Sequence, residues 1–173
     1  MIKYLLIFLV IFSSCKKVEE LVTFDITKSE KFTIQATGVS LPTDSILAPL
    51  TSVPTNTTTE FKNNRSETKY AKDVKLTKLD FEINSPPSAT FNFLKSIEIY
   101  ISSPGIAEKL IAYNRDVPRG VKSFELTTIP DKLDDYIKAE TYSLRVKAVV
   151  RETVPVDTQV TSNMIFRVTA KIL

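Results

Sequence analysis

Hydrophobic and polar residues alternate with a period of two along most of the chain after Thr23. In residues 79–83, for example, Leu, Phe and Ile alternate with Asp and Glu. Such alternation predicts strands that bury one face and expose the other, and therefore antiparallel sheets. The clearest alternating stretches are residues 32–37, 79–83, 97–101, 124–126, 142–150 and 164–172.

One strand carries a break in this phase. The apolar residues of 74–76 occupy even positions, whereas those of 79–83 occupy odd positions. Because a one-residue slip would turn the first part of the strand to solvent, we expect a β-bulge near Thr77 and Lys78 that restores the phase.

Only residues 131–137 look helical. They follow Pro130, begin with acidic residues, and place Leu133 three and four residues before Tyr136 and Ile137. This spacing predicts one short helical turn between two strands. Three prolines within residues 41–56 instead predict a long loop or a broken edge strand.

Six or more short strands without a long helix indicate an all-β fold. The length fits a single domain, so we expect one antiparallel β-sandwich over residues 23–173, with a closed barrel as the alternative.

The C-terminal half resembles an immunoglobulin or fibronectin type III domain. Residues 142–149 (YSLRVKAV) resemble the strand that carries the tyrosine corner of these domains, and Leu133 takes the place of its leucine partner. The resemblance covers about 100 residues from Val74 onward and implies an immunoglobulin-like sandwich.

The N-terminus has the features of a secretion signal. Lys3 precedes a run of apolar residues over 4–12 (YLLIFLVIF). This run is too short for the roughly 20 residues of a membrane-spanning helix, but it fits the core of a signal peptide.

The run ends in Phe12-Ser-Ser-Cys15, which resembles a bacterial lipobox. The resemblance implies cleavage before Cys15, a diacylglyceryl group on its sulfur and a further acyl chain on its amine. Residues 1–14 would then be the signal peptide and 15–22 a tether. The alternative is a buried core cysteine behind a first strand at 4–12.

Residues 16–20 (KKVEE) are broadly similar to the export signals of surface lipoproteins in Bacteroidota. Lys16 is also not the aspartate that often retains such proteins at the inner membrane, so we expect the outer membrane. The lipobox and the sandwich together resemble the small cell-envelope lipoproteins of Bacteroidota. The alternative for 16–20 is a simple solvated tether.

Composition narrows the chemistry further. The chain has no His, no Trp, one Cys and three scattered Gly. These absences exclude His-based catalysis, Cys/His zinc sites, an intrachain disulfide and a glycine-rich phosphate loop. The net charge of +3 falls to +2 without residues 1–14, which is too small for a broad nucleic-acid footprint. We therefore expect no cofactor, no metal and no nucleic-acid partner.

Three connections are expected at one end of the sandwich, at residues 84–92, 114–121 and 152–163. Loops on a rigid scaffold often bind partners, so an envelope protein or a surface glycan is the expected ligand. The alternative is three ordinary loops. The candidate binding residues are Pro86, Pro87, Arg115, Asp116, Arg119, Arg151 and Asp157.

Two other surfaces are candidates. The strand edges at 57–61 and 32–37 could pair with another chain, as in a structural subunit of a membrane complex. A basic strand face could bind anionic lipids or glycans, although its charges could equally pair with Glu98 or Glu125. The basic residues are Arg145, Lys147, Arg151, Arg167 and Lys171.

Enzymatic activity is not expected. Asp80 and Glu82 lie about 6.6 Å apart by strand rise, within the range of glycosidase carboxylates, but nothing in the sequence indicates a cleft. The acids of 131–135 lack the alternate spacing of a calcium loop and are better explained by the helix dipole. We therefore expect a non-catalytic binding or assembly protein.

Overall fold

A computed structural model describes residues 19–37, 50–54, 58–139 and 141–173. The expected signal peptide, Cys15 and most of the proline-containing stretch lie outside these residues. The strands are β1 (Leu21–Ile34), β2 (Leu50–Pro54), β3 (Ala71–Ser85), β4 (Leu94–Ser103), β5 (Ile106–Asn114), β6 (Ser123–Glu125), β7 (Thr127–Thr128), β8 (Thr141–Val150) and β9 (Thr158–Lys171). The helices are α1 (Thr58–Asn63) and α2 (Asp134–Lys138), with single 3₁₀ turns at Thr68–Tyr70 and Phe91–Phe93.

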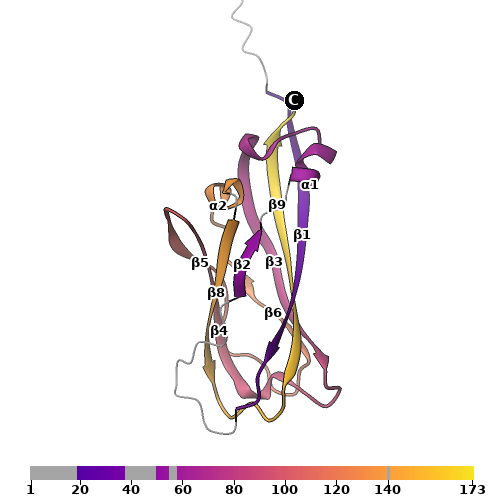
Figure 1. The fold of residues 1–173 in the computed structure, drawn as a ribbon, viewed down its shortest axis with the longest axis vertical. Coiled ribbons are helices and arrows are strands. Elements are labelled where there is room, and N and C mark those ends of the chain that lie inside the picture. The colour runs from indigo at the N-terminus through magenta and orange to yellow at the C-terminus, as the bar shows by residue number, and fades with distance from the viewer. Residues whose placement is uncertain (1–18, 38–49, 55–57, 140) are drawn as a thin grey trace, which may run out of the picture.

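The strands form two antiparallel sheets that face each other (Figure 1). One sheet has the order β1-β9-β3-β6 and the other β2-β8-β4-β5-β7. We call them sheet A and sheet B. The predicted all-β antiparallel sandwich is therefore confirmed. Among the described residues, no helix is both long enough and apolar enough to cross a membrane.

The strand order differs from that of an immunoglobulin domain. Four antiparallel pairs are nested along the chain: β1 with β9, β2 with β8, β3 with β6 and β4 with β5. This nesting, in which the last strand lies inside a sheet, is the topology of a jelly roll. In an immunoglobulin domain the last strand instead joins the sheet of strands C and F. The immunoglobulin-like connectivity is therefore corrected to a jelly roll.

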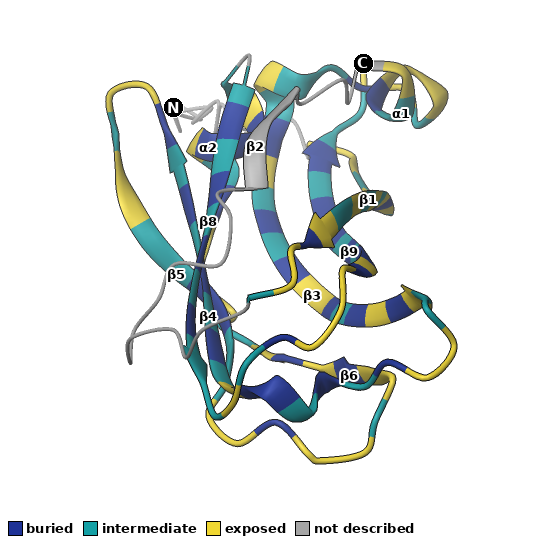
Figure 2. Ribbon diagram, turned by 60° about the horizontal axis from the view of Figure 1, so that its bottom comes forward, coloured by how far each residue is buried: buried dark blue, intermediate teal, exposed yellow. Residues whose placement is uncertain are grey.

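The core lies between the two sheets and contains the inward side chains of both (Figure 2). In β9, for example, the even-numbered residues from Val160 to Ala170 are all buried. Phe124 packs edge-on against Phe91 with ring centroids 4.8 Å apart, near the loops that join the sheets. Toward the opposite end, Ile137 of helix α2 and Leu133, the residue just before the helix, are buried in this core.

The phase break in β3 is a bulge, as predicted. The pairing of β3 with β9 shifts register between Leu76 and Lys78. Val74, Leu76 and Leu79 are consequently all buried, although they differ in parity. The hydroxyl of the exposed Thr77 donates a hydrogen bond of 3.0 Å to the Ile165 carbonyl.

Strands β1 and β5 differ from the sequence prediction, whereas α2 and β2 agree with it. β1 begins at Leu21, two residues before the expected start of the domain. β5 was not predicted, because a register shift interrupts its alternation where Ile111 and Ala112 are both buried. Helix α2 falls within the predicted helical stretch. β2 is an edge strand of sheet B within the stretch expected to be a loop or a broken edge.

Candidate functional site

Three loops meet at one end of the sandwich, as the sequence predicted. They are residues 86–93 between β3 and β4, 115–122 between β5 and β6, and 151–157 between β8 and β9. We call this the loop end. Backbone hydrogen bonds join the loops: Phe91 N–H donates to the Val121 carbonyl at 2.9 Å, and Arg151 N–H donates to the Phe93 carbonyl at 2.7 Å.

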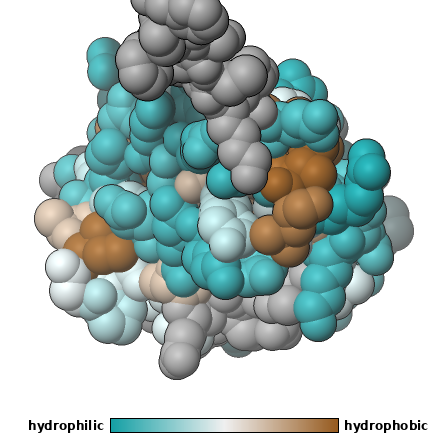
Figure 3. Space-filling view, turned by 90° about the horizontal axis from the view of Figure 1, so that it is seen from above, coloured by the Kyte–Doolittle hydropathy of each residue, from teal (hydrophilic) through white to brown (hydrophobic). Residues whose placement is uncertain are grey.

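The opposite end carries the first described residues and the last residue, and Figure 3 looks onto it. Ile172 N–H donates a hydrogen bond of 2.9 Å to the Glu20 carbonyl, which places these two segments side by side. We call this the terminal end. β1 and β9 run from the terminal end to the loop end, and a strand of 14 residues spans about 45 Å.

Arg151 links two of the three loops. Its Nη2 donates to Asp116 Oδ1 at 2.7 Å and to the Val117 carbonyl at 2.9 Å. Its side chain is only 15% exposed, whereas that of Asp116 is 87% exposed. Nη1 of Arg151 is buried without a hydrogen-bond partner among the described residues. Arg151 therefore holds the loops together and does not face an outside ligand.

A groove of about 470 Å³ lies between the first and third loops. Its lining combines hydroxyl groups, one carboxylate at Glu152 and apolar surface, including Val156, which is 41% exposed. Among the described residues no lysine or arginine lines the groove, so it suits a neutral or cationic ligand better than an anion. The lining residues are Ser88, Ala89, Thr90, Asn92, Phe93, Glu152, Thr153, Pro155, Val156 and Thr158.

None of the sequence-predicted binding residues is among those that line this groove. Pro86 is half-buried after a cis peptide bond, while Pro87 and Arg119 are exposed. The Arg115 guanidinium lies over the Tyr113 ring, 4.9 Å from its centroid. The remaining candidate, Asp157, accepts a hydrogen bond of 2.7 Å from Ala36 N–H and so joins the third loop to the segment after β1.

The lining residues were missed because small hydroxyl residues are common in any loop. Ser88, Thr90 and Thr153 carry no distinctive pattern in the sequence. Only their position next to the prolines of the same loops could have indicated them.

The five basic residues do not form one surface. β8 belongs to sheet B and β9 to sheet A, so Arg145 and Arg167 lie on different sheets. The prediction of a single basic face is therefore wrong. The Arg145 guanidinium makes two hydrogen bonds with Glu108, of 2.8 and 2.6 Å, and these bonds lower the pKa of the Glu108 carboxyl.

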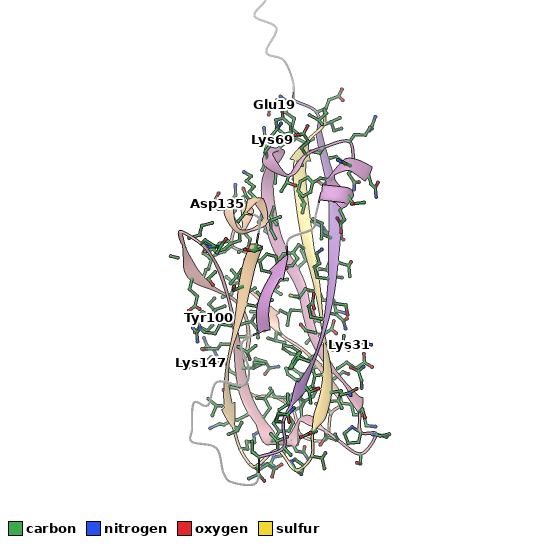
Figure 4. The ribbon with its side chains drawn as sticks, viewed as in Figure 1. Glu19, Lys31, Lys69, Tyr100, Asp135 and Lys147 are labelled. Carbon is green, nitrogen blue, oxygen red and sulfur yellow. The ribbon has the colours of Figure 1, made fainter. Side chains whose placement is uncertain are left out.

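Other basic residues of the expected face are also paired with carboxylates, which is the alternative to a binding surface. Lys147 lies 3.9 Å from Glu98, on the outer face of sheet B where Figure 4 labels Tyr100 and Lys147. Arg167 pairs with Asp25 at 3.0 Å. With their carboxylate partners in place, these side chains do not make a basic anion-binding surface.

The candidate carboxylates have structural partners. Asp80 lies 3.1 Å from Lys78 and accepts a hydrogen bond of 2.9 Å from Asn163. Asp134 accepts a hydrogen bond of 2.8 Å from Val74 N–H, which ties α2 to β3. In the part of the chain that the structure describes, no group of three Cys or acidic residues could hold a metal ion.

The sequence predicts exposed strand edges at residues 57–61 and 32–37, and the first of these two predictions is wrong. Residues 58–61 belong to helix α1, and Phe61 is fully buried against Phe24 with ring centroids 5.1 Å apart. The other edge is real, because β1 lies at the edge of sheet A. Lys28 and Glu30 are at inward-facing positions of β1, and inward charges on an edge strand disfavour indiscriminate pairing.

No protein-family profile matches the chain, and no curated protein matches its sequence. Among solved structures, the chain is similar to the capsid protein of BFDV in a 60-mer, with a TM-score of 0.43 and 8% identity over 89% of this chain and 95% of that one. It is also similar to a chain of Desmodium yellow mottle tymovirus, with a TM-score of 0.23 and 14% identity over 86% and 84% of the chains.

Proposed function

We propose that the protein is a lipoprotein of the bacterial cell envelope and that its jelly roll binds an envelope protein or a surface glycan. Lys16, in place of the aspartate that retains such proteins at the inner membrane, favours the outer membrane. Acyl chains on Cys15 hold it in the membrane, and residues 15–20 form the tether. The role is non-catalytic.

The placement of the two ends carries this proposal. The tether reaches the sandwich at the terminal end, whereas the loops gather at the opposite end, about 45 Å away along β1. A sandwich anchored through Cys15 therefore has its loop end free to project away from the membrane. Loops held on a rigid scaffold are a common location for binding sites.

The loop end also offers a surface suited to recognition. The groove combines hydroxyl groups that can donate and accept hydrogen bonds with the exposed side chain of Val156. Arg151 and its partners hold the loops in place before a ligand arrives, which reduces the entropy lost on binding.

The anchor is tested by the intact mass of protein purified from membranes of its native host. A mass equal to residues 15–173 plus acyl chains supports the proposal, and Cys15→Ala should abolish the modification. An unmodified full-length mass from the same membranes would contradict it.

Binding at the loop end is tested with the purified protein on a glycan array and by crosslinking in native membranes. Val156→Ser removes the exposed apolar side chain of the groove and should weaken binding. The control Lys147→Ser changes the outer face of sheet B and should leave binding unchanged. Equal effects of the two substitutions would contradict a loop-end site.

A second candidate is assembly into a membrane complex through the edge of β1. Val22, Phe24 and Phe32 on this strand are only partly buried, so a partner strand would cover them further. The Glu20 carbonyl accepts a hydrogen bond from Ile172, and in an antiparallel pair only every second residue of a strand bonds to that neighbour. Ser29 is an odd number of residues from Glu20, so its N–H points away from β9 and toward the free edge of the sheet. Ser29→Pro removes that donor and should abolish the complex without unfolding the sandwich, whereas Val156→Ser should leave it intact.

A further inference from the structure

We propose that the terminal end of the sandwich sits directly on the lipid bilayer that holds the acyl chains of Cys15. This inference rests on the proposed lipoprotein function and adds a second contact with the membrane. The occupant of the surface is the headgroup and upper acyl region of that same bilayer.

Apolar side chains are concentrated at this end. Leu21 is 51% exposed and Leu173 is 66% exposed; the remaining exposed large hydrophobic residue of the described chain, Val156, is at the loop end. Leu21 lies opposite Lys171 in the pairing of β1 with β9, and Leu173 follows two residues after Lys171, just beyond the end of β9. In Figure 3 strongly hydrophobic surface is visible on this end of the molecule.

The length of the tether brings this end close to the membrane. Four residue steps separate Cys15 from Glu19, and a fully extended chain of that length spans at most about 14 Å. Glu19 is itself fixed on the terminal end, because its carboxylate pairs with Lys72 and, at 3.6 Å, with Lys171. The tether therefore cannot hold the terminal end far from the lipid headgroups.

The polar residues of this end suit a membrane interface. The Lys69 ammonium lies over the Tyr70 ring, 5.0 Å from its centroid, and both Lys and Tyr are favoured at headgroup depth. Figure 4 labels Lys69 and Glu19 at this end. The exposed Arg65 adds a further positive charge. Because Glu67 and Glu19 offset part of this charge, the apolar contact of the two leucines is the main attraction.

The absence of tryptophan from the chain allows a direct test. Leu21→Trp and Leu173→Trp each place one fluorophore at the terminal end, and Val156→Trp places one at the loop end as the matched control. Each variant is expressed from the complete precursor in the native host, extracted with its acyl chains and reconstituted into phosphatidylethanolamine and phosphatidylglycerol vesicles. A second vesicle preparation carries brominated acyl chains that quench tryptophan at the membrane.

We expect the emission of Trp at positions 21 and 173 to shift to shorter wavelength and to be lost in brominated vesicles. Emission from position 156 should keep the wavelength of water-exposed indole and escape quenching. Absence of quenching at 21 and 173, or equal quenching at 156, would overturn the inference.

Intact mass of the same preparations separates this inference from the function on which it rests. If Cys15 is acylated but positions 21 and 173 are unquenched, the membrane contact is wrong and the lipoprotein function stands. If Cys15 carries no acyl chain, both are wrong.

Discussion

The guanidinium of Arg151 and the carboxylate of Asp116 lie 2.7 Å apart and tie the loop after β8 to the loop after β5. The two partners differ in surroundings, because Arg151 is largely buried and Asp116 is not. Arg151 also donates to the Val117 carbonyl, a bond that does not depend on Asp116.

We therefore expect unequal effects from removing the two partners. Arg151→Ala should lower the free energy of unfolding by about 1–3 kcal/mol, because the buried Val117 carbonyl loses a charged donor. Asp116→Ala should cost less than about 1 kcal/mol, as an exposed ion pair does. Urea denaturation measures both, and a larger loss for Asp116→Ala would contradict the assignment of Arg151 as the loop-holding residue.

The bulge in β3 predicts a large effect of deleting a single exposed residue. Without Thr77, the side chains of Val74 and Leu76 would point to solvent and no longer into the core. At about 1.5–3 kcal/mol for each buried side chain, the deletion should cost about 3–6 kcal/mol.

Thr77→Val is the control for that deletion, because it keeps the extra residue and removes only the hydroxyl bond to Ile165. It should cost about 1 kcal/mol or less. Thermal denaturation of both variants distinguishes a register effect from the loss of one hydrogen bond, and equal costs would argue against the bulge.

Two buried tyrosines should respond in opposite ways to loss of their hydroxyl. Tyr136 Oη donates a hydrogen bond of 2.6 Å to the Ala107 carbonyl, whereas Tyr142 Oη is buried without a partner among the described residues. Tyr136→Phe should destabilise the fold by about 1 kcal/mol, and Tyr142→Phe should be neutral or stabilising. A clear loss of stability in Tyr142→Phe would indicate a bond of the tyrosine-corner kind after all.

Tyr142 also predicts a dependence of stability on alkaline pH. Burial raises the pKa of its phenol above the ordinary value of 10.0, and the carboxylate of Glu30 raises it further. Above pH 10 the unfolded chain releases this proton while the folded chain retains it, so stability present below pH 10 is lost as the pH rises. The loss approaches about 1.4 kcal/mol per pH unit.

Urea denaturation at about pH 9 and pH 11 measures this loss. Tyr142→Phe should show a shallower decline than the unchanged protein. The other tyrosines titrate in both proteins, so they cancel in the comparison. Identical slopes would mean that Tyr142 ionises in the folded state as readily as in the unfolded chain.

Local features of this fold follow from the sequence because they depend on neighbouring residues. The parity change between Leu76 and Leu79 fixes the bulge, since both residues must be buried. The loop end was also predictable, because chain reversals alternate between the two ends of a sandwich. Helix α1 was not, because a helix this short, with Phe61 as its buried anchor, shows no helical period.

Sheet membership could not be derived in the same way. Arg145 and Arg167 both lie in strands whose apolar and polar residues alternate. This alternation shows which face of a strand is exposed to solvent, but not which sheet the strand joins. The nested pairing of a jelly roll depends on contacts between residues more than a hundred positions apart, such as Asp25 with Arg167. For the same reason the groove, formed by two loops distant in sequence, had no local signal.

The long pairing of β1 with β9 has a mechanical consequence. Force applied between Glu19 and the loop end runs along these strands, so it loads all their hydrogen bonds at once, in shear. Force between Glu19 and Leu173 would instead open the same bonds one after another, as a zipper opens. A domain anchored at its first strand and pulled by a partner at its far loops is therefore loaded in the direction in which its outermost strand resists best.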